Sequence, residues 1–271
     1  MAGLWRADRA RVDPAVRRDA WNQLWLVLAL SLLASAVYAV LSLAQTLSSP
    51  GGLRAGTATL HQSLSQVPVF DLLRQLASIG FALMPVVLAV YLLGGPLVSG
   101  VRTGWAAGAR LIGFDTRRPL LDLALGALLA AVIGVPGLLL YLGAHAAGLA
   151  VTVNPGNLPG QWWSWAIYLL SAAQNAVLEE TVVVGFTLTR LRQAGVGLGP
   201  AVLFSAVLRG SYHLYQGFGA FAGNAVMGVI FAAVFRRMGR VMPLIVAHTL
   251  IDLVAFVGYA LLAGHVSWLP S

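Results

Sequence analysis

Two adjacent carboxylates lie in the middle of a long apolar stretch of this chain. Glu179 and Glu180 are the only glutamates among its 271 residues. An acid at the centre of a membrane helix costs about 2.5–3.5 kcal/mol on insertion scales, so ionisable residues there usually have partners and a function. The later apolar segments contain four candidate partners, which are Arg209, His213, His248 and Asp252.

These residue types are suited to activating water in a dry site. A carboxylate or an imidazole can act as a general base there, and two adjacent acids tend to share one proton. A second imidazole can stabilise a developing oxyanion. The residue types alone leave these roles unassigned, and two other interpretations stay open. One is an ion pair of the glutamates with Arg209 that only braces helices, and the other is a proton relay in a transporter.

The spacing of these residues places them at a similar depth. Counted from the flanking arginines or proline at about 1.5 Å per residue, Glu180 lies about 15 Å from the cytoplasmic edge, His248 about 12 Å, Asp252 about 18 Å and His213 about 20 Å. His248 and Asp252 are four residues apart, as are Arg209 and His213, so each pair shares one helical face. Three helices should therefore carry these groups into one layer.

The composition is that of a polytopic membrane protein. Hydrophobic residues make up 59% of the chain and charged residues 10%, against about 25% charged in a typical soluble domain. There is no cysteine and no lysine, which excludes disulfides, thiolate nucleophiles, Cys-ligated metals and Schiff-base chemistry. The net charge of +8 comes with 17 arginines that mostly flank apolar segments, which indicates topology signals rather than nucleic-acid binding.

Seven apolar segments predict an all-α, polytopic transmembrane helical bundle of about seven spans. They cover about residues 21–46, 70–98, 120–142, 162–189, 200–215, 217–235 and 241–262, and Pro85 is expected to kink the second. With the N-terminus in the cytoplasm, 14 of the 17 arginines fall in cytoplasmic segments, as the positive-inside rule requires. A short interfacial helix is expected between residues 48 and 68. The first apolar run is too long for a cleavable signal.

Three motifs in the last part of the chain resemble those of one family. Glu179-Glu180-Thr-Val-Val-Val184 is similar to Glu-Glu-x-x-x-Arg, Arg209-Gly-Ser-Tyr-His213 to Phe-x-x-x-His, and His248-Thr-Leu-Ile-Asp252 to His-x-x-x-Asn/Asp. The family is that of the CAAX-protease and bacteriocin-processing (CPBP, Abi) intramembrane proteins, which includes the type II prenyl-protein endopeptidases. The resemblance covers about residues 165–260.

The resemblance implies a glutamate-dependent intramembrane endopeptidase. It implies that Glu179 and His213 activate water, that His248 with residue 252 holds the oxyanion, and that Glu180 supports the site. Together with the hydropathy pattern, it divides the chain into three expected parts: a basic cytoplasmic segment (1–20), variable transmembrane helices (21–160) and a CPBP-like catalytic core (161–264).

Two positions depart from the family motifs. Val184 stands where the motif has arginine, and Arg209 where the motif has phenylalanine. We expect that Arg209, one turn from His213, supplies the positive charge that the motif arginine would supply, and that it pairs with Glu180. Asp252 stands where many members have asparagine. An ionised aspartate cannot donate to an oxyanion, so it is either protonated at this depth or orients His248.

The sequence therefore predicts an enzyme, a multi-pass protein of a bacterial plasma membrane. It would hydrolyse a peptide bond of a membrane-associated protein or peptide, with the bilayer and that substrate as its partners and no nucleic acid. No cofactor is expected; zinc would suit two histidines and a glutamate, but the His-Glu-x-x-His spacing is absent. The alternatives are a non-catalytic immunity or scaffold protein with the same fold, and a transporter, for which no inverted repeat is evident.

Overall fold

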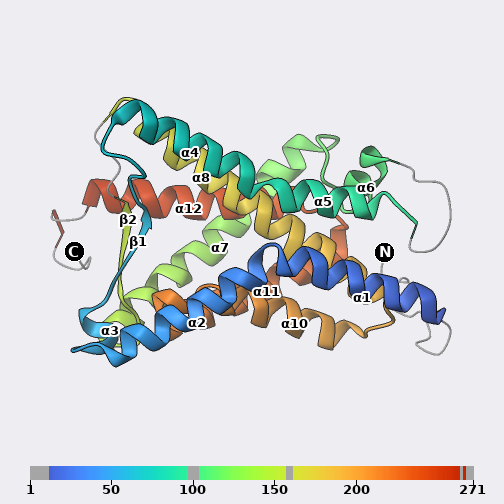
Figure 1. Cartoon of the computed structure of the whole chain (residues 1–271), viewed down its shortest axis with the longest axis horizontal. Helices are drawn as coiled ribbons and strands as arrows, with labels where there is room; N and C mark the ends of the chain where they lie inside the picture. The colour runs from blue at the N-terminus through green and yellow to red at the C-terminus, as the bar shows by residue number, and fades with distance from the viewer. Residues whose placement is uncertain (1–11, 97–103, 157–160, 263–264, 267–271) are drawn as a thin grey trace.

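The computed structural model describes residues 12–96, 104–156, 161–262 and 265–266, and they form a helical bundle (Figure 1). The expected all-α class is confirmed. The α-helices are α1 (Pro14–Ala29), α2 (Leu32–Ser48), α3 (Gly52–Ala55), α4 (Pro68–Ala82), α5 (Met84–Leu93), α6 (Trp105–Leu111), α7 (Pro119–Ala146), α8 (Ser164–Glu179), α9 (Thr187–Gln193), α10 (Leu198–Ser211), α11 (Phe218–Met238) and α12 (Met242–Leu262). The other elements are β1 (Thr57–His61), β2 (Thr152–Gly156), a π-helical segment η3 (Glu180–Phe186) and a 3-10 turn η4 (Leu214–Gln216).

Four described helical segments are long and apolar enough to cross a membrane. They are α4 with α5 (Pro68–Leu93), α7, α11 and the part Met242–Tyr259 of α12. The pair α1 and α2, bent by 50° at the break between them, makes a fifth if it is counted as one span. The seven spans expected from the sequence are therefore not confirmed.

Length and burial explain the difference. Helix α10 has 14 residues, so it extends about 21 Å, less than the ~30 Å of hydrocarbon that a span must cross. The fourth expected span is divided into α8, η3 and α9, and all residues from 179 to 191 are buried inside the protein. That segment is therefore a central helix, which is surrounded by other helices of the bundle.

The first and second expected spans are each interrupted near their middle. Helix α1 begins at Pro14, before the expected start, because the Asp13 side chain accepts a hydrogen bond from the Ala15 N–H and proline suits a first helical position. It ends near Ser31, whose hydroxyl donates to the Val27 carbonyl at 2.6 Å. The kink expected at Pro85 is confirmed: α4 ends at Ala82, and α5 begins at Met84 with the proline in its first turn.

Two loops that the sequence left without strands form a parallel pair. Strand β1 pairs with β2 in the register Thr57 to Thr152 and His61 to Gly156, and Figure 1 shows the pair at the end of the bundle away from α6. The short helix expected between residues 48 and 68 is α3, and β1 follows it directly. Strand β1 contains Thr57 and Thr59, and β2 begins with Thr152 and Val153, which are residue types that favour extended backbone. Only the fold brings the two segments together.

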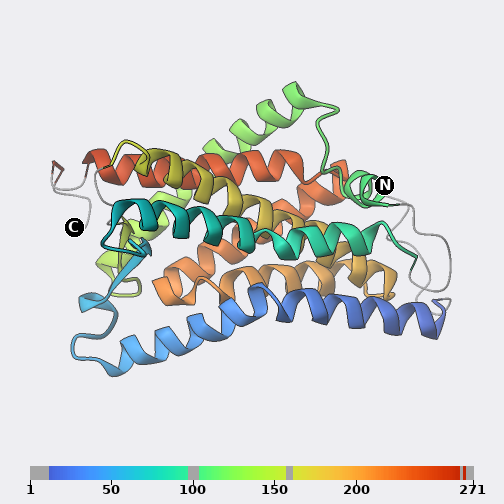
Figure 2. The ribbon, with the colours of Figure 1, turned by 45° about the horizontal axis from the view of Figure 1, so that its top comes forward.

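The segment α8–η3–α9 crosses the bundle diagonally behind α4 and α5 (Figure 2). It packs against α1, α5, α10, α11 and α12. Its buried side chains belong to the same hydrophobic core as those of α1, α5 and α12. Residues on this segment can therefore meet residues from α10 and α12 in the interior.

Ion pairs of Arg240 with Asp115 and Asp122 hold the N-terminal end of α12 in place. Arg240 donates to both carboxylate oxygens of Asp122, at 3.0 and 2.6 Å, and to the side chain and carbonyl of Asp115, at 3.0 and 2.9 Å. Gly113, with φ of +61°, lets the chain pass Arg240, where a Cβ would lie 2.6 Å from the arginine Cα. This clamp joins the start of α7 to the turn between α11 and α12.

The Asp115 carboxyl has a pKa below its ordinary value of 3.8. Partial burial raises this pKa, but the Arg117 N–H and the Arg240 guanidinium lower it by more. The hydrogen bonds that Arg240 makes with Asp122 raise the pKa of Arg240, and burial opposes them. Since the folded-state pKa of Asp115 is depressed, its contribution to stability is present at neutral pH and is lost as the pH falls through that pKa.

We predict that Asp122→Asn lowers the free energy of unfolding by about 1–3 kcal/mol, because Arg240 loses the more buried of its two charged partners. Asp115→Asn should have a smaller effect, which shrinks as the pH falls below about 4. Thermal unfolding in detergent between pH 3 and 7 measures both. An unchanged melting temperature in Asp122→Asn would show that the clamp does not stabilise the fold.

Candidate active site

The two glutamates lie where the central helix changes its winding. Glu179 is the last residue of α8, and Glu180 is the first residue of the π-helical segment η3. Segments of π-helix are rare in proteins, and those that occur often lie at functional sites. The sequence that follows, Thr181 to Val184, is β-branched throughout and so has a lowered preference for the regular α-helix.

Three side-chain hydroxyl groups donate hydrogen bonds to backbone carbonyls of the π-helical segment η3. Thr187 donates to the Val182 carbonyl at 2.8 Å, and Thr189 donates to the Gly185 carbonyl at 2.6 Å. Ser205, on α10, donates to the Val183 carbonyl at 2.9 Å. Because buried carbonyls need donors, these three side chains stabilise η3 and fix α10 against it.

Glu180 makes a buried ion pair with Arg209. Arg209 Nη2 donates to Glu180 Oε1 at 2.6 Å, and both side chains have no solvent exposure. His248 Nδ1 lies 2.7 Å from the same oxygen. A single carboxylate oxygen thus connects η3, α10 and α12. The expected pairing of Arg209 with Glu180 is confirmed as a contact.

Glu179 has a different environment from its neighbour. Its Oε2 accepts a hydrogen bond from the Tyr212 hydroxyl at 2.7 Å and lies 3.5 Å from Arg209 Nη1. Its side chain keeps 11% exposure, whereas that of Glu180 has none. Within the described residues its Oε1 accepts no hydrogen bond, and it is not among the buried atoms that lack a partner. Glu179 is therefore the carboxylate that a water molecule can reach.

The two histidines are held in defined orientations. His213 Nδ1 lies 3.0 Å from the Arg209 carbonyl, which can only accept, so Nδ1 carries a proton and Nε2 remains available as a base. Glu180 likewise fixes His248 Nδ1 as a donor, and His248 Nε2 lies 3.6 Å from Asp252 Oδ2. This is the arrangement of an imidazole oriented by a carboxylate.

The structure brings the side chains of five of the six expected site residues into direct contact with one another. They are Glu179, Glu180, Arg209, His248 and Asp252. The sixth, His213, interacts electrostatically with Glu179, and its ring lies 4.8 Å from that of Tyr212. No hydrogen bond joins the His213 and Glu179 side chains in the described part of the chain.

Tyr212 is the site residue that sequence reasoning missed. It lies three residues after Arg209 and directly before His213, so its position beside a motif histidine was the available signal. Two histidines outside the motifs lie elsewhere. His145 is 3.2 Å from the Thr152 hydroxyl, and His61 packs edge-on against Tyr168 and Phe256, where burial lowers its pKa to about 4.

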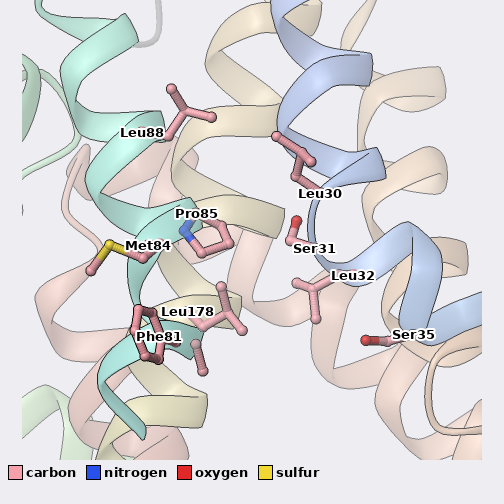
Figure 3. A pocket seen from close by; sticks show the side chains of 10 residues that line it. Leu30, Ser31, Leu32, Ser35, Phe81, Met84, Pro85, Leu88 and Leu178 are labelled. Atoms are coloured by element: carbon pink, nitrogen blue, oxygen red, sulfur yellow. The ribbon is translucent and has the colours of Figure 1, made fainter. Parts of the chain in front are cut away.

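A groove of about 560 Å³ opens between the α1–α2 break and the α4–α5 break (Figure 3). Its lining is mostly apolar, with Ser31 and Ser35 as its two serines, and Phe81, 76% exposed, is among the lining residues. The Ser31 hydroxyl in the lining is already bonded within α1. Leu178, the residue before Glu179, also lines the groove, so the groove reaches the helical turn that carries the glutamates.

Three of the site residues have donor atoms close enough for one metal ion. Among the described residues, Glu179, Glu180 and His248 each offer an atom within 4.8 Å of the others. The Arg209 guanidinium occupies the same space, at 2.6 and 3.5 Å from the two carboxylates. A divalent cation at this position would face that fixed positive charge, so the donor set suits an arginine better than a metal.

Comparison with known proteins matches residues 161–254 to the family model described as type II CAAX prenyl endopeptidase Rce1-like. This part of the chain is similar to the members of that family. The match covers less than half of the chain, and it coincides with the region of the three motifs. No curated protein and no solved structure matches the chain. The match supports a membrane protease at the level of the family.

We predict that Arg209→Met destabilises the protein by about 3–5 kcal/mol, because it leaves Glu180 as a buried charge without its cation. Adding Glu180→Gln to this variant should recover much of the loss. Unfolding in detergent measures the difference. Arg192→Met is the control, since Arg192 has no ion pair among the described residues. Equal stability of Arg209→Met and the double variant would contradict a coupling between the two charges.

Proposed function

We propose that the protein is an intramembrane endopeptidase in which Glu179 and His213 activate a water molecule. The observation that supports this best is the difference between the two carboxylates. Arg209 and His248 engage Glu180, which is fully buried, and Glu179 keeps one oxygen accessible. A general base needs such an accessible atom, and a bracing residue does not.

The proposed reaction is the hydrolysis of a peptide bond. Glu179 Oε1 takes one proton from a water molecule, whose other hydrogen is donated to His213 Nε2, as the water oxygen bonds to the scissile carbonyl carbon. His248, in its imidazolium form with a proton on each ring nitrogen, donates from Nε2 to the oxyanion that forms. The C–N bond then breaks, and the proton held by Glu179 passes to the leaving nitrogen. Glu180 keeps the imidazole of His248 oriented, and Asp252 holds it from the other side.

The proposed substrate is a membrane-associated protein or peptide. The mostly apolar groove beside Leu178 supports this, because it suits the apolar side chains of such a substrate. A prenylated CAAX peptide is the first defined substrate to test, since the matched family carries that name. We place the protein in a bacterial plasma membrane with a cytoplasmic N-terminus, and we propose no metal or other cofactor, because Arg209 supplies the positive charge.

A non-catalytic scaffold is the competing function. The observation in its favour is Val184, which stands where the family motif has arginine. The Arg209 contact with Glu180 weakens this argument, because it supplies a cation to the same carboxylate. The two functions differ in whether peptide bonds are cleaved in a Glu179-dependent way.

We predict that new protein N-termini appear in membranes that contain the natural protein and not in membranes that contain Glu179→Gln. The comparison uses isolated membranes of a deletion strain supplied with equal folded amounts of each form, and mass spectrometry of protein N-termini. Cleavage should persist in EDTA. Identical N-termini in both samples would favour the scaffold, and loss of cleavage in EDTA with recovery on adding zinc would contradict the metal-free site.

A further inference from the structure

The Tyr212 hydroxyl is placed to act on one atom of the proposed site. It donates to Glu179 Oε2 at 2.7 Å, and the side chain is buried at the end of α10. This is the one hydrogen bond that the Glu179 carboxylate makes within the described residues, because Arg209 directs its closer nitrogen to Glu180. Glu179 thus depends on a neutral phenol where Glu180 has a cation and an imidazole.

Packing alone does not require this hydroxyl. A phenylalanine would fill the same space at the end of α10, and an unpaired phenol would be costly to bury. The hydrogen bond favours the ionised form of the Glu179 carboxylate over its protonated form. It also fixes Oε2, so that Oε1 is the oxygen left to receive a proton.

We infer that Tyr212 is a positioning residue of the proposed protease, which holds the Glu179 carboxylate ionised and turned so that Oε1 meets the attacking water. This inference rests on the proposed function. It assigns a function to a position that the second motif, Phe-x-x-x-His, leaves unspecified. The residue acts through Glu179 and does not touch the substrate.

Several other charged or titratable groups also face Glu179. They are Glu180 on η3, Arg209 on α10, His213 after it, Tyr215 on η4, and His248 and Asp252 on α12. All of them remain in a Tyr212→Phe variant. A change in pH dependence that is confined to this substitution can therefore be assigned to the lost hydrogen bond.

The experiment measures the initial rate at which Glu179-dependent N-termini appear in isolated membranes between pH 5 and 9. The samples contain equal folded amounts of the natural protein, Tyr212→Phe, Tyr141→Phe and Glu179→Gln. Tyr141 is the matched control, because its hydroxyl also makes one hydrogen bond, to the Val153 N–H at 3.1 Å, away from the glutamates. Melting temperatures in detergent are recorded for each form.

Tyr212→Phe is expected to lower the rate about 10-fold at pH 6 and to regain much of it at pH 9, so that the acidic limb of the profile moves to higher pH. Tyr141→Phe should match the natural protein at every pH. A Tyr212→Phe profile identical to that of the natural protein would overturn the inference, as would a uniform loss at all pH values.

Two further outcomes are also decisive. If Tyr212→Phe does not fold, Tyr212→Met is used in its place, and failure of both to fold would assign the residue to stability and overturn the inference. If Glu179→Gln produces the same N-termini as the natural protein, the proposed function itself fails, whatever Tyr212→Phe does.

Discussion

The buried contact of Arg209 with Glu180 is the interaction on which the rest of the site depends. Two charges without solvent exposure gain strength from the low dielectric around them, but each would be costly alone. Since His248 shares the same carboxylate oxygen, one atom ties α10 and α12 to the start of η3. Removing the cation would therefore disturb the geometry of both neighbouring helices.

This contact also gives the two adjacent glutamates, Glu179 and Glu180, different environments. Glu180 is fully buried and has Arg209 and His248 on one oxygen, while Glu179 has one hydroxyl donor and a reachable oxygen. Adjacent residues on a helix point about 100° apart, and the winding of η3 begins between them. The same residue type can then serve as a brace at one position and as a base at the next. The groove between the broken helices approaches this turn from the side of Leu178.

The sequence was most informative where charge is rare. In a chain with 10% charged residues, an acid pair, an arginine and histidines at regular spacing had few alternative partners. The spacing therefore predicted both the helices that would meet and the pairing of Arg209 with Glu180. The kink at Pro85 followed from the missing N–H of proline. These inferences needed only local rules and the cost of burying charge.

What could not be predicted depends on contacts between distant segments. The strand pair joins Thr57 to Thr152, and the sequence of neither segment indicates that the other is its pairing partner. The π winding of η3 is supported by hydroxyls, of which Ser205 comes from another helix. The number of spans failed for a related reason, because hydropathy does not separate a helix facing lipid from one enclosed by protein. In the sequence, Tyr212 is one more aromatic residue of an apolar segment, and only the structure shows that its hydroxyl donates to Glu179.

The most direct test of the central claim moves the cation back to the motif position. Val184 lies on η3 four residues after Glu180 and is fully buried, so an arginine there can face the same carboxylate. Arg209→Phe should lose stability and Glu179-dependent cleavage, and the double variant Val184→Arg with Arg209→Phe should recover a substantial part of both. The measurement is the melting temperature together with the rate of new N-termini in isolated membranes. A double variant no better than Arg209→Phe would contradict the claim that Arg209 replaces the motif arginine.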